Sequence, residues 1–95
     1  MNLMWSPGAT EDLRALGAYI AEEDPAVARR IVLRILDMLE QLLVNHPAMD
    51  RPGRVPGTRE LVVAQTPYII PYRVVRDEIQ ILRVYHSARR WPENF

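Results

Sequence analysis

Apolar residues recur along the chain with two different periods, and the change of period divides it into two parts. From Ala9 to Leu42 they recur every three or four residues, the spacing of one buried face on a helix. From Thr58 to Tyr85 they form short runs rich in valine, isoleucine and tyrosine, separated by turn residues, as in β-strands. The pattern predicts two helices followed by three strands, and the short apolar stretch at residues 2–5 predicts one further strand.

Each predicted helix begins with a capping residue followed by proline. In Ser6-Pro7 and Asp24-Pro25 the first side chain can accept a backbone N–H, and proline suits the first helical position. We expect the first helix to end near Glu23 and the second to stop at residues 45–47, Asn-His-Pro. Because the connection is short, the two helices should form an antiparallel hairpin. Their core-facing residues are Ala9, Leu13, Leu16 and Ile20 in the first helix and Ala28, Ile31, Ile35, Leu39 and Leu42 in the second.

The strands of the second half are expected at residues 58–64, 68–75 and 79–85. Pro71 lies in the middle of the second strand and has no N–H to donate to a neighbour, so we expect an interruption there. The segment before the strands, residues 48–57, contains two prolines and two glycines and is expected to be a loop.

The register of the last two strands decides which side chains share a face, because a slip of one residue reverses every side chain. A three-residue loop would pair Val75 with Ile79 and would place Arg73, Arg83 and Tyr85 on one face. A two-residue loop would separate Arg73 from Arg83. We favour the three-residue loop, since it separates polar from apolar side chains better.

Length and composition restrict the class of protein. A chain of 95 residues, 48% of them hydrophobic, fits one domain that spans residues 1–95. Without cysteine, neither a disulfide framework nor a thiolate metal site can form. The sequence shows no signal peptide, no membrane-spanning run, no phosphate loop and no metal-ligand cluster. We therefore expect a cytoplasmic protein that uses no cofactor or metal and does not act at a membrane.

Charge is unevenly distributed along a chain whose formal net charge is zero. Residues 1–47 contain four arginines and seven acidic residues, a net −3, whereas residues 48–95 contain eight arginines and five acidic residues, a net +3. The second half could thus meet a phosphate backbone or an acidic partner, or simply carry solvated charges on its strands and turns. Every basic residue is arginine, which cannot act as a base near neutral pH, so proton transfer would need histidine, a carboxylate or tyrosine.

Several motifs follow one another in a fixed order. They are Trp5 near a short first strand, the helix hairpin, Pro-Gly-Thr-Arg-Glu-Leu at 56–61, Pro-Tyr-Ile-Ile at 67–70, Tyr-Arg-Val at 72–74 and Ile-Leu-Arg-Val-Tyr-His-Ser-Ala-Arg-Arg-Trp-Pro at 81–92. Together they resemble the RelE/ParE superfamily of type II toxin–antitoxin toxins. The resemblance implies an α+β fold, with an N-terminal strand and a two-helix antiparallel hairpin packed on a small, mostly antiparallel sheet of three to four strands. It also implies a cognate antitoxin that binds and neutralises the chain.

The superfamily divides by function. ParE-like members poison DNA gyrase, and RelE-like members cleave messenger RNA on the ribosome. For cleavage, the resemblance and the chemistry point to His86 as the proton-transfer residue, the catalytic candidate. In either function, the residues expected to bind phosphate or the target are Arg59, Arg73, Arg83, Tyr85 and Arg89.

Two departures from the RelE-like pattern favour inhibition by binding. Ile69 occupies the position where RelE-like nucleases usually place an arginine, and the lysines that several of them use are absent. A histidine at the end of a strand, such as His86, also has a structural interpretation, in which it bonds to the backbone. We therefore expect a ParE-like toxin that binds DNA gyrase; a ribosome-dependent mRNA endonuclease is the alternative, and a member that retains only antitoxin binding is a third.

Overall fold

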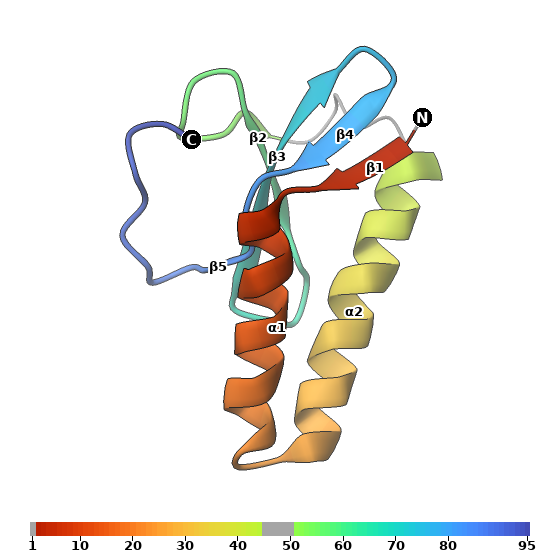
Figure 1. Cartoon of the computed structure of the whole chain (residues 1–95), viewed down its shortest axis with the longest axis vertical. Coiled ribbons are helices and arrows are strands. Elements are labelled where there is room, and N and C mark those ends of the chain that lie inside the picture. Colours follow the sequence, from red (N-terminus) through yellow and green to blue (C-terminus); the bar gives the residue numbers. More distant parts are fainter. Residues whose placement is uncertain (1, 45–50) are drawn as a thin grey trace.

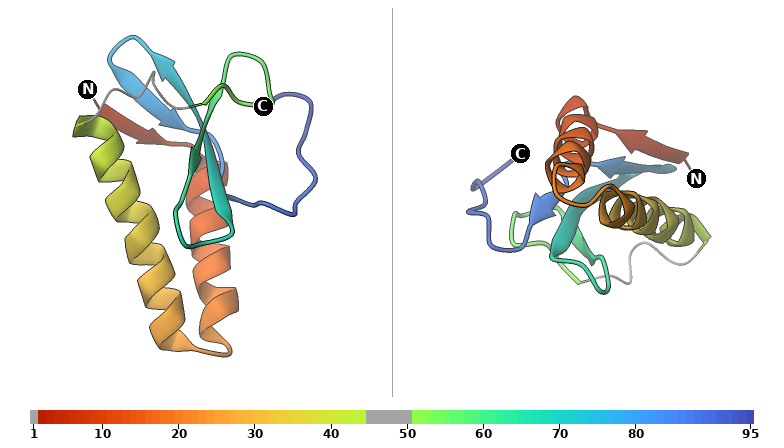
Figure 2. Two further views of the ribbon diagram at one scale, coloured as in Figure 1. Left: turned by 180° about the vertical axis from the view of Figure 1, so that it is seen from behind. Right: turned by 90° about the horizontal axis from the view of Figure 1, so that it is seen from below.

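The computed structural model describes residues 2–44 and 51–95, and two helices cover one face of a mixed sheet (Figures 1 and 2). The predicted α+β class is confirmed, although the sheet has five strands, more than the three or four expected. Strand order is β1-β4-β3-β2, with β5 also paired to β3; β1 is parallel to β4 and the other pairs are antiparallel. The elements are β1 (Asn2–Trp5), α1 (Pro7–Ala21), α2 (Pro25–Val44), β2 (Arg59–Val62), β3 (Tyr68–Val75), β4 (Glu78–Ile81) and β5 (Tyr85–His86).

Both predicted helix starts are confirmed. The Ser6 hydroxyl accepts the N–H of Ala9 at 3.0 Å, and the Asp24 carboxylate accepts two backbone N–H groups at the start of α2. Helix α1 ends at Ala21, slightly before the expected residue. The predicted stop of the second helix at residues 45–47 lies outside the described residues. Neither described helix is both long and apolar enough to cross a membrane.

The hydrophobic core lies between the helix hairpin and the sheet. The helices contribute residues from the predicted stripes, and the sheet contributes one apolar face. The helices approach closely at Gly17, where a Cβ atom would lie 3.3 Å from a methyl group of Val32. The largest fully buried side chains include Ile35, Leu39, Ile70, Tyr72, Ile79, Ile81 and Tyr85.

The predicted register of the last hairpin is wrong. Val75 pairs with Glu78, so the turn has two residues, and Arg76 has a positive φ of 55°, as mirror-image hairpin turns require. This register places buried Tyr72 opposite buried Ile81, so the apolar face is continuous toward the helices. Arg73 pairs with Gln80, and Arg83 lies beyond the end of β4.

The interruption expected at Pro71 occurs in the neighbouring strand. Strand β3 is continuous from Tyr68 to Val75, whereas the expected strand at residues 79–85 breaks between β4 and β5. The N–H of Leu82 donates to the Pro71 carbonyl at 3.0 Å, but Pro71 has no N–H to return. The Leu82 carbonyl instead accepts the Ser6 hydroxyl at 2.7 Å. Because Pro71 lacks this donor, β4 ends before Leu82. The Leu82 carbonyl bonds to Ser6 instead, which ties the end of β4 to the start of α1.

Candidate functional site

The break between β4 and β5 is held in place by Asp12 of α1. The Asp12 carboxylate accepts two hydrogen bonds from the Arg83 guanidinium, at 2.7 and 2.9 Å, and one from the Val84 N–H at 3.0 Å. The hydrogen bond to Asp12 is the largest influence that raises the pKa of Arg83 above its ordinary value. A bidentate pair of this kind fixes the direction of the arginine as well as its charge.

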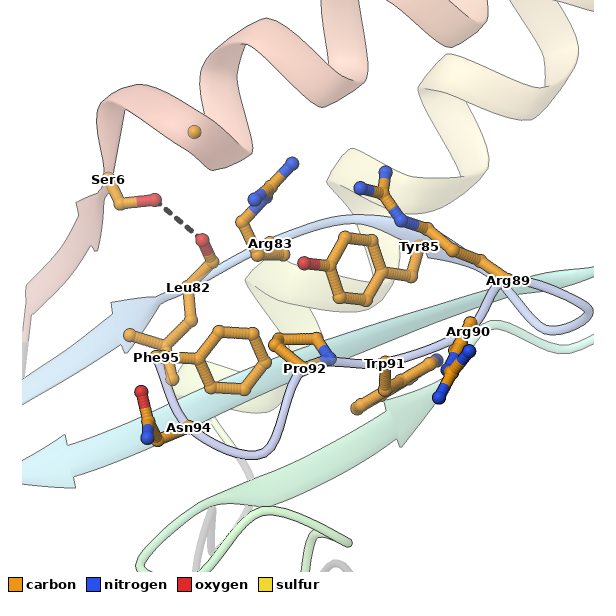
Figure 3. A pocket seen from close by; sticks show the side chains of 11 residues that line it. Ser6, Leu82, Arg83, Tyr85, Arg89, Arg90, Trp91, Pro92, Asn94 and Phe95 are labelled. Carbon is orange, nitrogen blue, oxygen red and sulfur yellow. Dashed lines mark hydrogen bonds between the residues drawn. The ribbon is translucent and has the colours of Figure 1, made fainter.

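Tyr85, at the start of β5, is the centre of an aromatic and cationic cluster. Its side chain is 2% exposed. The guanidinium carbons of Arg83 and Arg89 lie 4.9 and 4.4 Å from its ring centre. The rings of Trp91 and Phe95 lie 5.2 and 6.2 Å away. The C-terminal segment therefore folds back over Tyr85 (Figure 3).

An open cavity of about 700 Å³ lies beside this cluster, between the start of α1, the segment that follows β4 and the C-terminal segment (Figure 3). The residues that line it include no acidic side chain. The indole nitrogen of Trp91 is buried and has no hydrogen-bond partner among the described residues. The lining consists of Ser6, Gly8, Leu82, Arg83, Tyr85, Arg89, Arg90, Trp91, Pro92, Asn94 and Phe95.

His86 does not take part in this cluster. It follows Tyr85 in β5, so its exposed side chain points to the opposite face. Its Nδ1 accepts the N–H of Ala88 at 3.1 Å, and its ring packs edge-on against Tyr68 with 5.7 Å between the ring centres. This contact with the backbone lets the His86 ring close the turn after β5.

The structure brings together three of the predicted binding residues, Arg83, Tyr85 and Arg89, and leaves two apart. Arg59 on β2 pairs with Tyr72, and Arg73 on β3 pairs with Gln80. Both are partly buried in the sheet, and neither lines the cavity. The expectation that Arg73 shares a face with Arg83 and Tyr85 depended on the three-residue loop and fails with it.

The sequence analysis missed a buried carboxylate behind the cluster. Glu60, 3% exposed, accepts hydrogen bonds from the side chains of Arg51 and Arg54 and from the backbone N–H of Arg54. Burial alone would raise its pKa, but the hydrogen bonds from the two arginines outweigh this effect and lower it below its ordinary value. The Arg54 guanidinium also lies 3.8 Å from the centre of the Trp91 ring.

The only sign of this arrangement in the sequence is an acidic residue inside an apolar strand with arginines a few positions upstream. Asp12 gave no comparable sign, because its partner Arg83 is 71 residues away. Among the residues that the structure describes, no group of three or more histidine, cysteine or acidic side chains could hold a metal ion.

Comparison with known proteins identifies the family. A family model described as the ParE toxin of the type II toxin–antitoxin system, parDE, matches residues 3–91. The chain belongs to this family. It is 46% identical over 92 residues to Y4kP of Sinorhizobium fredii, with 97% of this chain and 94% of that protein covered. It is 34% identical to Toxin RelE2 of Caulobacter vibrioides, with 93% and 97% covered.

A solved structure of a ParDE toxin–antitoxin system supports the same assignment. The chromosomal ParDE system of P. aeruginosa contains a chain that matches with a TM-score of 0.79 and 34% identity, covering 90% of this chain and 95% of that one. The matched family segment includes the Asp12–Arg83 pair, Tyr85 and Trp91. As a member of the ParE toxin family, the chain is a type II toxin, and family membership implies an antitoxin partner.

Proposed function

We propose that this ParE-family toxin inhibits growth in the cytoplasm by binding a target protein, DNA gyrase, and that a cognate antitoxin neutralises it. The cluster of Arg83, Tyr85 and Arg89 is the proposed contact surface for the target. Its aromatic and arginine side chains are the types that most often dominate the binding energy at protein interfaces. Arg59 and Arg73, elsewhere on the sheet, are proposed to add peripheral contacts.

The position of His86 is the observation that carries this proposal. Cleavage of RNA by its own 2′-hydroxyl needs a proton acceptor next to the cations that hold the phosphate. Here the imidazole contacts Tyr68 and the Ala88 N–H, whereas the guanidinium groups of Arg83 and Arg89 lie against Tyr85. Separation of the proton acceptor from the cations favours binding over cleavage.

The alternative, a ribosome-dependent mRNA endonuclease, has one observation in its favour. Arginines around an aromatic ring can hold a phosphate and stack on a base, and Arg89 and Tyr85 have this arrangement. In that function His86 would be the catalytic acid or base, and it would first have to release the Ala88 N–H.

Both helices of the toxin expose apolar side chains and its sheet has an open edge, so the proposed antitoxin could bind either surface. Tyr19, Leu33 and Leu36 are 76%, 51% and 38% exposed. Strand β1 lies at one end of the strand order, where an added strand could pair with it. Exposed apolar side chains and an open edge favour association, and an antitoxin helix or strand would cover them.

Two assays on one purified preparation test the choice of target. The first measures supercoiling of relaxed plasmid by gyrase, and the second measures cleavage of ribosome-bound message. We expect gyrase inhibition without cleavage.

Arg89→Gln should weaken inhibition at least about tenfold. Arg29→Gln, which replaces an exposed arginine on α2, should leave inhibition unchanged. Message cleavage that His86→Ala abolishes would replace this proposal with the endonuclease, and no growth inhibition on induction would contradict both.

A further inference from the structure

We propose that Arg54 is a positioning residue, which holds the Trp91 ring in place and thereby keeps the C-terminal segment folded over Tyr85. The effect of Arg54 on the target rests on the proposed function, whereas its effect on Trp91 does not. Three observations support this role: the fixed position of Arg54, the few contacts that hold the segment of Trp91, and the carboxylate that Arg54 shares with Arg51.

Arg54 is fixed by the loop before β2. Its N–H donates to the Glu60 carboxylate at 2.8 Å, and its guanidinium donates to both oxygens of the same carboxylate, at 3.0 and 3.3 Å. On either side of it, the Gly53 N–H donates to the Thr58 carbonyl at 2.7 Å, and Val55 is 2% exposed. Because both its backbone and its guanidinium are bound, Arg54 can hold a neighbouring group at a defined place.

The C-terminal segment, by contrast, depends on ring contacts (Figure 3). Residues 90–95 form no hydrogen bond among the residues that the structure describes. Trp91 and Phe95 instead lie against Tyr85, with 5.2 and 6.2 Å between the ring centres. The Arg54 guanidinium carbon lies 3.8 Å from the centre of the Trp91 ring. The place of the segment therefore depends on few contacts, and Arg54 supplies a charged one.

The contact between Arg54 and Trp91 is favourable, because a cation over an aromatic face is attracted by the ring, and tryptophan is the best of the aromatic side chains for it. It offsets an unfavourable feature, since the Trp91 indole N–H is buried without a hydrogen-bond partner among the described residues. Without Arg54, the ring would gain by turning this N–H to water. We therefore expect loss of the cation to release the segment for part of the time and to uncover Tyr85.

Arg51 offers a matched control in the same network. Its guanidinium also donates to Glu60, at 2.8 Å, and its side chain is 52% exposed, against 45% for Arg54. Within the described part of the chain, Arg51 does not lie over an aromatic ring. Arg51→Gln and Arg54→Gln thus remove the same charge and hydrogen bonding to the same carboxylate, and they differ in the contact with Trp91.

Under the proposed function, the position of the C-terminal segment affects the target. Arg83, Tyr85 and Arg89 form the proposed contact surface, and the Arg89 guanidinium carbon lies 4.4 Å from the centre of the Tyr85 ring. A surface that is already ordered in its binding arrangement loses less conformational entropy when it binds. Arg54 should thus raise the affinity for gyrase without contacting it.

Fluorescence quenching of the full chain tests the effect on Trp91. In a Trp5→Phe background Trp91 is the remaining tryptophan, so quenching by acrylamide reports its exposure. We expect Arg54→Gln to raise the quenching constant about twofold or more, the effect of one cation–π contact on an equilibrium. Arg51→Gln should leave the constant unchanged, and Arg54→Lys, which keeps a cation, should raise it less than Arg54→Gln. Circular dichroism shows whether each variant is folded.

A double-mutant cycle in the gyrase assay tests the effect on the target. Arg54→Gln should weaken inhibition about two- to fivefold in the wild-type background. It should have no effect in a Trp91→Leu background, because the contact is then already lost. Arg51→Gln should leave inhibition unchanged in both backgrounds.

Four results would overturn the proposal. They are a quenching constant that Arg54→Gln does not raise, an equal rise with Arg51→Gln, inhibition that Arg54→Gln does not weaken, and the same loss of inhibition with and without Trp91. If the wild-type chain does not inhibit gyrase, the proposed function fails by itself, and quenching still decides whether Arg54 positions Trp91.

Discussion

Glu60 is a buried charged residue, and the four hydrogen bonds that its carboxylate accepts account for its place there. Its carboxylate binds the segment at residues 51–54 to β2, while the same Arg54 lies on Trp91. A buried carboxylate is tolerated only when paired and hydrogen-bonded. Glu60 therefore connects the loop before the sheet with the aromatic cluster.

We predict that Glu60→Gln lowers the free energy of unfolding at pH 7 by about 2 kcal/mol, because half-exposed Arg51 and Arg54 lose their carboxylate but remain solvated. The pKa of Glu60 is lowered on folding, so its contribution is present above the unfolded pKa, about 4.3, and is lost as pH falls through the folded pKa. Urea unfolding of both proteins at several pH values measures the difference.

The difference in stability between wild type and Glu60→Gln should therefore be complete at pH 7 and should shrink as the pH falls below about 4. Glu40→Gln, on an exposed position of α2, is the control and should behave as wild type at each pH. If this difference stayed constant down to pH 2, the loss of stability would come from the shape of the substituted side chain and not from its charge.

Asp12 and Glu11 are neighbouring acids in α1 with different environments. Asp12 is 12% exposed and pairs with Arg83 across 71 residues, whereas Glu11 is 61% exposed and pairs with Arg14 within the helix. We predict that Asp12→Asn lowers the free energy of unfolding by about 1 to 2 kcal/mol and reduces target inhibition, because Arg83 and Val84 lose their acceptor. Glu11→Gln should change neither in thermal melts or gyrase assays. Equal effects of the two substitutions would contradict the positioning role of Asp12.

At the scale of elements, the sequence predicted the starts of both helices correctly but not the pairing of the last strands. Ser6 and Asp24 cap helices because their partners lie two or three residues away, so the sequence was sufficient. The last hairpin lacks a turn pair such as Asn-Gly, and its register depends on which residues face the helices. Pro71 interrupts the neighbouring strand and not its own, because the missing N–H removes a hydrogen bond between the two strands. The predicted site depended on the register of the last hairpin and on the effect of Pro71. Of the five predicted binding residues, the structure therefore brings together only Arg83, Tyr85 and Arg89.

Close packing of α1 against α2 depends on Gly17, which has no side chain. A Cβ atom at Gly17 would lie 3.3 Å from Val32, so a larger side chain must push the helices apart. We predict that Gly17→Leu lowers the free energy of unfolding by about 1 to 3 kcal/mol despite the better helix propensity of leucine. Ala18→Leu, at the next and exposed position, should stay within about 0.5 kcal/mol of wild type in thermal unfolding. A Gly17→Leu protein as stable as wild type would show that the two helices can separate freely.

At the scale of the whole molecule, charge and function are proposed to divide between two surfaces. The acidic residues of the first half lie mostly on the helices. The arginines of the second half lie on the sheet, in the segments that adjoin its strands and in the C-terminal segment. The Asp12–Arg83 pair joins the two parts. Under the proposed function the helices offer apolar surface to an antitoxin, and the arginine-rich side meets the target. Inhibition of gyrase should then weaken with rising salt, as expected of contacts between exposed charges.

Removal of the C-terminal segment after Arg90 separates its structural role from its proposed functional role. The loss of Trp91 and Phe95 uncovers Tyr85, and each ring pair contributes about 0.5 to 1.5 kcal/mol. We predict a folded protein with a free energy of unfolding lower by about 1 to 2 kcal/mol, because the core between helices and sheet is untouched. Gyrase inhibition should fall at least about tenfold, since Tyr85 loses the ring contacts that hold the proposed contact surface in place. Glu93→Gln, an exposed substitution in the same segment, is the control. A truncated chain that is folded by circular dichroism and inhibits gyrase as strongly as the full chain would place the target contact elsewhere, with the arginines of β2 and β3 as the next candidates.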